Sequence, residues 1–343
     1  SMQNDAEVWA EHSLQAFTKT LKQQHPDIIH LHGCWRTQNL MAFQRAQKEG
    51  ARLVFSPHGQ LEPWILRQHF WRDKLPKLIA YQRRIASHAY AIITMGRMEK
   101  GCMTRLKYNP RIETVYNAVI TETITKEQMG QQVYAIYRKV LDSDPWPRMD
   151  EKIHTAVKAF IKAGLTGDAH WLTDSEQEAV QNIDSEDWRK ILLYAHLEHI
   201  DKTVAQGIHT TGQAPPSDFD PAQTDHYMPH RFDDAIRQLD TSGKNDTERF
   251  VKAIRSARKL THNRHFTIMH LVELADLMRH SLADEEKTVR QLDDHKLVTF
   301  AGRIMQLLSQ FTGLEEGFMP LPPRIDQQAH RIEQQITKHL EII

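Results

Sequence analysis

Two histidines that end apolar runs are the residues of this chain best placed for chemistry. His32 closes the run DIIHLH and precedes Gly33, and His58 follows the run RLVFSP and precedes Gly59. An imidazole exchanges protons near neutral pH and binds hydroxyl groups, so it suits acid–base or polar-ligand work. The neighbouring glycines let the backbone turn sharply or approach a ligand. His30 alternates with His32 along its run, and we expect it to pack in the core or against a helix.

The elements that position these histidines alternate along the chain. Four β-rich apolar runs occupy residues 27–33, 52–59, 90–96 and 112–117, and helical periodicity marks residues 5–24, 38–49, 61–88 and 97–106. Continuous apolar character suits strands buried on both faces of a parallel sheet. The alternation predicts a partial Rossmann-like α/β fold of about four parallel strands. Ligands bind beyond the carboxyl ends of such strands, so the loops 32–37, 57–64, 95–99 and 116–119 meet at one candidate edge.

The pattern changes after Ala118. Apolar residues then recur at helical spacing with no strand between them, so we expect residues 121–343 to form a larger all-α domain after an α/β domain at 1–120. Thr173 and Asp184 are predicted helix N-caps. The predicted helices cover residues 125–141, 150–163, 174–182, 186–206, 231–239, 246–260, 265–282, 285–312 and 324–342, with Pro-rich loops near 209–230 and 312–324.

Charge is divided between the two predicted domains. Residues 1–120 hold 17 Lys and Arg against 9 Asp and Glu, a net charge of +8, and the rest carries −8 because the total is zero. Two interpretations stay open: the two halves dock on each other, or the basic half faces an anionic ligand or membrane. Two cysteines make no disulfide framework, and no run reaches the ~18 apolar residues of a membrane span. We therefore expect a cytoplasmic location.

The order of landmarks DIIHLHGCW, ARLVFSPHGQLEPW, QRRIASHAYAIITMG and IETVYNAV resembles the acceptor-side N-terminal domain of the retaining glycosyltransferases of family 4. That family has two facing Rossmann-like domains, the GT-B fold. The resemblance covers residues 27–119, and SPHGQLEPW is its most specific part. The glycine-rich loop and further strands with which the family usually opens do not precede Ala6, so the sequence is expected to begin within the domain.

The resemblance implies roles for several residues. His58 matches a histidine that lies near the transferred sugar, and Asn117 matches the asparagine of the interdomain motif. Glu62, Trp64 and Trp35 would line an acceptor pocket together with His32, Gly33 and Gly59, because a carboxylate accepts sugar hydroxyls and indoles offer flat faces. Core packing is the alternative for both tryptophans.

The family's sugar-nucleotide domain has no counterpart in the sequence. It would alternate strands and helices after Asn117 and carry a basic pair and a Glu-x7-Glu pair. Glu178/Glu186 and Glu333/Glu341 have that spacing but lie in helical segments. No cofactor is therefore predicted to be required, and a nucleotide-sugar donor is not supported by the sequence.

Residues 61–88 combine basic and apolar side chains around Pro76, which is expected to kink or divide the segment. Such a helix either packs on the sheet with a solvated basic face or contacts the inner face of the membrane. Histidines at His196/His199 and at His262/His265 do not complete a metal-ligand set, and no module for nucleic acid is present.

The sequence therefore predicts a glycosyltransferase-like protein of polysaccharide or glycoconjugate assembly. It would bind a glycan or lipid-linked sugar acceptor, and a partner transferase would supply the donor site. The alternative is a non-catalytic interaction or regulatory protein whose helical domain recruits a partner enzyme. In either case the machinery that stabilises a leaving diphosphate is missing from the legible motifs.

Overall fold

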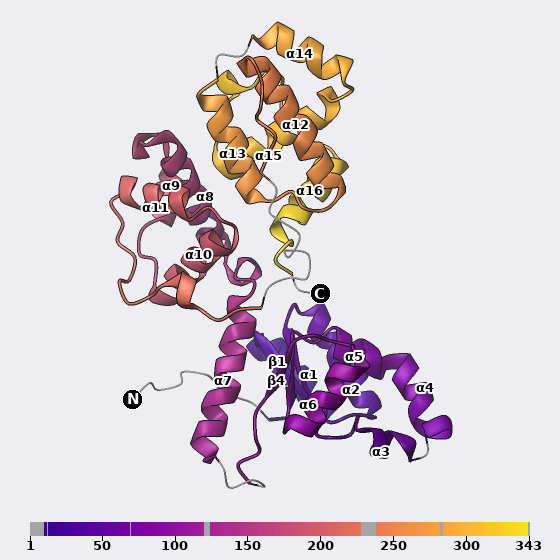
Figure 1. The fold of residues 1–343 in the computed structure, drawn as a ribbon. Helices are drawn as coiled ribbons and strands as arrows, with labels where there is room; N and C mark the ends of the chain where they lie inside the picture. The colour runs from indigo at the N-terminus through magenta and orange to yellow at the C-terminus, as the bar shows by residue number, and fades with distance from the viewer. Residues whose placement is uncertain are drawn as a thin grey trace. The chain divides into compact units, whose positions relative to one another are not determined.

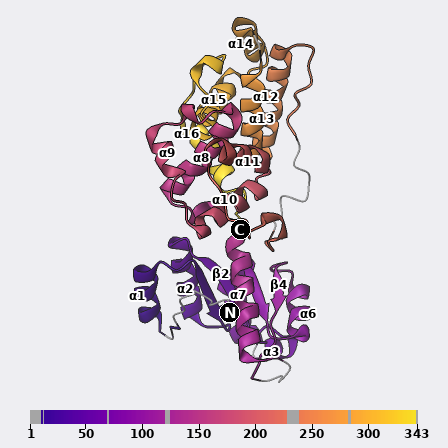
Figure 2. The same ribbon diagram turned by 90° about the vertical axis from the view of Figure 1, so that its left-hand side faces the viewer.

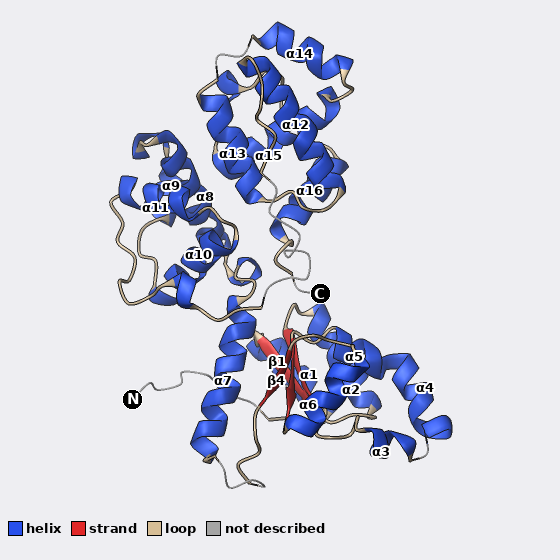
Figure 3. Ribbon diagram, viewed as in Figure 1, coloured by secondary structure: helices blue, strands red, loops and turns tan. Residues whose placement is uncertain are grey.

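In the computed structural model, the chain divides into two compact units, Ser1–Leu141 and Asp142–Ile342. The described residues are 10–11, 13–68, 70–119, 124–227, 238–281 and 284–341. Among them, strands occur only in the first unit, and the second is helical (Figure 3). The expected fold class, a four-stranded parallel sheet followed by a mostly helical remainder, is confirmed.

The sheet has the order β1-β2-β3-β4, and every neighbouring pair is parallel. Its strands are β1 (Ile28–His32), β2 (Arg52–Ser56), β3 (Ala91–Thr94) and β4 (Ile112–Thr114). Each lies within one of the four predicted runs. Val54, Phe55, Ile92 and Ile93 are at most 1% exposed, which explains why the central runs are continuously apolar.

One face of the sheet is covered by helices that connect its strands (Figure 1). Since each crossover runs in the same direction and crossovers are right-handed, the connecting helices fall on the same side. Leu31 and Phe55 from the sheet share a core with Phe43, Ile85 and Met103 from these helices. The helices are α1 (Leu14–Gln24), α2 (Thr37–Lys48), α5 (Arg83–Ser87) and α6 (Arg97–Leu106).

The segment predicted as one helix over 61–88 is divided into short pieces. They are α3 (Pro63–Arg67), a π-helical turn (Phe70–Lys74), α4 (Leu75–Lys77), a second π-helical turn (Leu78–Gln82) and α5. Pro76 lies in α4 between the two π-turns. Proline lacks the amide hydrogen that a regular α-helix needs there, so the interruption follows the expectation.

The other face of the sheet is covered by α7 (Lys126–Asp142), which lies along it in both views (Figures 1 and 2). The helix buries Ile136 and Val140. Its Lys139 pairs with Glu113 of β4 at 3.1 Å. The sequence analysis placed the boundary of the first domain at 120, whereas the compact unit runs to Leu141 because it includes this helix.

The second unit is built from helices around a single apolar core that includes Phe160, Tyr194, Ile254, Leu274 and Ile304. The helices are α8 (Glu151–Thr166), α9 (Asp174–Ala179), α10 (Ser185–Leu197), α11 (Asp201–Thr210), α12 (Asp246–His262), α13 (Ile268–Arg279), α14 (Glu285–Asp294), α15 (Val298–Thr312) and α16 (Gln327–Thr337). Both predicted N-caps are confirmed: Thr173 forms a capping box with Glu176, and Asp184 accepts from the Asp187 amide.

Two predicted helices are each broken in two. The segment 186–206 is interrupted by His199, whose φ is 55°, and 285–312 by Lys296, also at 55°. A left-handed residue ends a helix, and neither histidine nor lysine announces it in sequence as glycine does. The helix predicted over 231–239 falls mostly outside the described residues, and the predicted loops near 209–230 and 312–324 contain only single 3-10 turns among the described residues.

Candidate functional site

The carboxyl ends of β1 and β2 bring His32 and His58 into direct contact. Nδ1 of His32 lies 2.8 Å from Nε2 of His58, and the rings stack with centroids 5.1 Å apart. His58 has a φ of 52° and Gly59 one of 73°. A left-handed histidine followed by a left-handed glycine turns the chain back at the strand end, which directs the His58 ring toward β1.

This pair holds a proton between two bases. One nitrogen of a hydrogen-bonded imidazole pair must carry the hydrogen and the other must accept it. Burial, and then the nearby His58, lowers the pKa of His32. The pair can therefore donate to, or accept from, a hydroxyl group at the sheet edge, which is the chemistry that a polyhydroxylated ligand requires.

His30 lies behind this pair and contacts a helix, as expected. Its Nδ1 is 2.6 Å from the Tyr137 hydroxyl of α7, and its Nε2 is 2.8 Å from Oγ of Ser56. Its ring lies 4.1 Å from that of His32. Burial, with His32 and His58 nearby, lowers the pKa of His30 to about 3, so this ring is neutral at physiological pH.

Gln60 ties the first two strand-end loops together. Its Oε1 accepts from the Cys34 amide at 2.6 Å, and the Gly33 amide donates to the Ser56 carbonyl at 2.8 Å. Gly33 has a φ of 75°, a conformation that glycine adopts without strain. The predicted positions Gly33 and Gly59 are therefore both turn glycines beside the histidine pair.

Glu99 joins the second and third strand-end loops, and the sequence analysis missed it. This carboxylate of α6 is 4% exposed. Its Oε1 accepts from the Gly59 amide, and its Oε2 accepts from the Met95 amide at 2.7 Å. The available sequence signal was a carboxylate in the first helical turn after a strand-end glycine, where the helix dipole favours negative charge.

Glu62 and Trp64 lie together at the start of α3. The indole nitrogen of Trp64 donates to Oε2 of Glu62 at 2.8 Å, and Trp64 is 59% exposed. The Glu62 carboxylate also lies 3.7 Å from the position of a methyl group on Gly59. An exposed indole beside a carboxylate offers a sugar both a flat face and a hydrogen-bond acceptor.

Trp35 and Asn117 have more local surroundings. Trp35 is half-buried against the sheet core, with its amide donating to Oε1 of Gln82 at 3.3 Å and Nζ of Lys74 lying 6.0 Å from its ring centroid. Asn117 follows β4, and its Oδ1 accepts from the Val119 amide at 2.9 Å. The structure does not bring these two residues into contact with the histidine pair through any described hydrogen bond.

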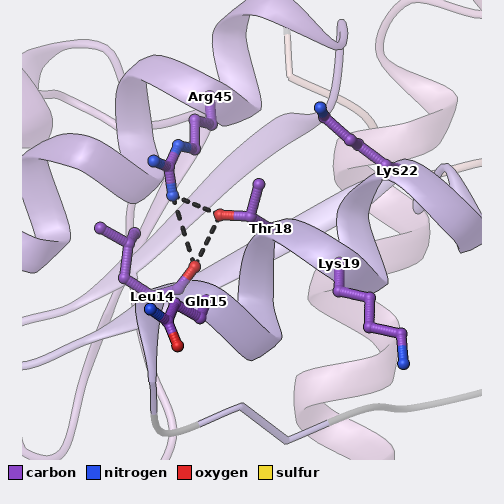
Figure 4. A pocket seen from close by; sticks show the side chains of 6 residues that line it. All are labelled: Leu14, Gln15, Thr18, Lys19, Lys22 and Arg45. Atoms are coloured by element: carbon purple, nitrogen blue, oxygen red, sulfur yellow. Dashed lines mark hydrogen bonds between the residues drawn. The ribbon is translucent and has the colours of Figure 1, made fainter.

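A shallow pocket lies away from the strand-end edge, between α1 and α2 (Figure 4). Arg45 reaches across it and donates to Oγ1 of Thr18 and, at 3.3 Å, to the Leu14 carbonyl. Its two lysines, Lys19 and Lys22, are exposed. The guanidinium is thus used to join two helices, and none of the predicted site residues lines this pocket.

Two further features were searched for across the described residues. They contain no group of three or more His, Cys, Asp or Glu side chains arranged to hold a metal ion. They also contain no helix of the length and apolar character needed to cross a bilayer.

The comparison with protein families decides the character of the first unit. Residues 8–123 match the model of Glycosyltransferase Family 4. This segment is a Glycosyltransferase Family 4 domain. It contains all four strands, and the rest of the chain is a helical region without a family assignment.

Comparison with curated proteins finds no match, and neither does comparison with solved structures. A Glycosyltransferase Family 4 domain implies a sugar acceptor. The matched segment ends before α7, so Tyr137 reaches His30 from outside it.

Proposed function

We propose that the Glycosyltransferase Family 4 domain binds a glycan or lipid-linked sugar acceptor at its strand-end edge. The observation that carries the proposal is the joining of His32 and His58 at 2.8 Å within that domain. His58 would donate to or accept from a sugar hydroxyl, while Glu62 and Trp64 would hold the ring. The pathway would be assembly of a polysaccharide or glycoconjugate.

We further propose that the sugar-nucleotide donor binds elsewhere than in the helical unit of this chain. The described residues of that unit form helices and no parallel sheet, so they offer no strand-end edge of the kind on which α/β folds bind nucleotides. Transfer would then need a partner chain that supplies cationic or backbone donors to the leaving diphosphate.

The test of acceptor binding is a glycan array probed with the full chain, followed by titration of each positive glycan. We expect His58→Ala and Glu62→Ala each to weaken binding about tenfold, the equivalent of about 1.4 kcal/mol. His88→Ala is the matched control, because His88 bonds to Arg84 and Ser87 instead of the site. Binding that survives both site substitutions would refute the proposed location.

The donor question is tested by thermal shift with a panel of sugar nucleotides. The proposal expects no saturable stabilisation of the full chain by any of them. Stabilisation that saturates at micromolar concentration and is retained in His58→Ala would place a donor site in this chain and overturn the second half of the proposal.

We also propose that residues 61–88 contact the inner face of the membrane, where a lipid-linked acceptor would lie. Trp71 is 80% exposed, Ile79 is 73% exposed and Trp64 is 59% exposed, an unusual display of large apolar side chains on one segment. Arg72 and Lys77 are neighbours that would meet anionic headgroups.

Vesicle sedimentation separates this idea from a solvated basic face. The full chain should sediment with phosphatidylglycerol vesicles and not with phosphatidylcholine vesicles, and Trp71→Ala should reduce the bound fraction several-fold. Trp171→Ala is the control, because Trp171 is a 57% exposed tryptophan of the helical unit. Equal losses from the two substitutions would argue against a membrane role for residues 61–88.

A further inference from the structure

The inference concerns a tyrosine that lies beyond the matched family domain. Tyr137 belongs to α7, and the family match ends at residue 123. Its hydroxyl is 2.6 Å from Nδ1 of His30. The other ring nitrogen of His30 is 2.8 Å from Oγ of Ser56. With both nitrogens engaged, the His30 ring has a single favoured orientation, in which one nitrogen donates and the other accepts.

That orientation reaches the candidate site through ring contacts. The His30 and His32 rings lie 4.1 Å apart, and His32 in turn bonds to His58. Tyr137 also meets His30 edge-on, with ring centroids 5.7 Å apart. A row of four side chains therefore runs from the α7 helix to the exposed strand-end edge, and each member limits the rotation of the next.

Three other contacts fix α7 against the sheet, so Tyr137 is held in place. The buried Arg52 of β2 donates to the carbonyls of Val140 and Leu141, at 3.3 and 2.9 Å. These carbonyls end the helix, where a cation is favoured by the helix dipole. Lys139 pairs with Glu113 on β4, as described above.

We infer that Tyr137 is a positioning residue for the candidate sugar site, acting on the His32–His58 pair through His30. The inference rests on the proposed function only for what the pair binds. It extends the working part of the domain past the end of the family match, because a segment cut at residue 123 would lack the hydroxyl that orients His30.

The test uses Tyr137→Phe, which removes one oxygen atom, and Tyr134→Phe as its control on the same helix. The full chain is labelled with ¹⁵N-histidine, and long-range ¹H–¹⁵N spectra report the tautomer of each assigned imidazole. We expect Tyr137→Phe to change the tautomer populations of His30 and to shift the imidazole signals of His32 and His58. Tyr134→Phe should leave all three unchanged.

Sugar binding provides the second measurement. On a glycan identified with the wild type, Tyr137→Phe should weaken binding about fivefold, the size of one hydrogen bond in an equilibrium constant. Ser56→Ala removes the other partner of His30 and should shift the same imidazole signals, which keeps the test valid should Tyr137→Phe fail to fold. Unchanged His32 and His58 signals in both variants would overturn the inference. Shifted signals in a chain that binds no glycan would support it while refuting the proposed function.

Discussion

Nδ1 of His32 and Nε2 of His58 lie 2.8 Å apart across the ends of two parallel strands, although the residues are separated by 26 positions in sequence. Neither ring can be described alone, because the hydrogen between them belongs to the pair. The pair is also the point where the sheet, the left-handed turn at His58 and the contact to His30 come together.

The first prediction concerns the protonation of this pair. Burial and the neighbouring His58 lower the pKa of His32, so His58→Ala should raise the pKa of His32 toward its ordinary value of about 6.5. The measurement is an NMR titration of the histidine imidazoles in the full chain. His88→Ala should leave the His32 titration unchanged, and an unchanged His32 titration in His58→Ala would contradict the coupling.

The second prediction concerns the carboxylate that joins two strand-end loops. Glu99→Ala leaves the Gly59 and Met95 amides without their acceptors, so we expect a loss of about 3 kcal/mol in the free energy of unfolding of the first unit. Glu99→Gln keeps one acceptor oxygen and should lose about half as much. Urea unfolding measures both, and Lys100→Ala, an exposed neighbour on α6, is the control. Equal stability of the Ala and Gln variants would exclude the assigned role.

How far the sequence predicts such features depends on whether their cause is local. Leu53, Val54 and Phe55 declare a buried strand through their own types, and Thr173 declares a helix start through its spacing from Glu176. The four strands and both caps follow from signals of this kind. Histidine beside glycine at two strand ends likewise predicts where the candidate site lies.

The rest of the site depends on contacts that sequence does not display. Glu99 binds backbone amides of other loops, and any residue type has such amides. Tyr137 is 107 positions from His30, in a segment that periodicity marks only as a helix. The helix breaks at His199 and Lys296 depend on left-handed backbone that tertiary packing imposes on ordinary residues.

The third prediction concerns a buried carboxyl in the helical unit. Glu198 is 2% exposed, and Nδ1 of His339 lies 3.1 Å from its Oε1. Burial, and then the nearby Asp144, raises the pKa of Glu198 well above its ordinary value, while the Ile268 amide opposes the shift. Tyr194 is the other titratable neighbour, and burial lowers the pKa of His339 to about 4. The folded chain therefore keeps a proton on Glu198 that the unfolded chain releases.

The sign of the pH dependence follows from the raised pKa. The stabilising contribution of protonated Glu198 is fully present below the unfolded pKa of about 4.5 and is lost as the pH rises toward the folded pKa, at about 1.4 kcal/mol per pH unit. Glu198→Gln mimics the protonated form, so it should be more stable than the wild type at pH 8 and lose that advantage near pH 4.5. Hydrogen exchange of α10 peptides measures this, with the exposed Glu178→Gln as control. A stability difference that does not vary with pH would rule out the buried proton.

The last prediction concerns two glycines that let α8 and α11 approach each other. A methyl group on Gly207 would lie 1.8 Å from the Phe160 carbonyl oxygen, and one on Gly164 would lie 2.0 Å from the Thr203 carbonyl oxygen. Backbone atoms in packed helices have little room to move, so Gly207→Ala must separate the two helices and open their shared core. We expect a loss of about 3 kcal/mol in the stability of the helical unit.

Gly130 provides the opposite case on α7, because nothing lies within 4 Å of a methyl group added there. At this exposed position within a helix, Gly130→Ala should stabilise the first unit by about 0.5–1 kcal/mol through reduced backbone entropy of the unfolded chain. Urea unfolding with hydrogen exchange assigned to α7 and α11 peptides separates the two effects. If Gly207→Ala and Gly130→Ala change stability in the same direction, close approach of α8 and α11 is not what requires glycine at position 207.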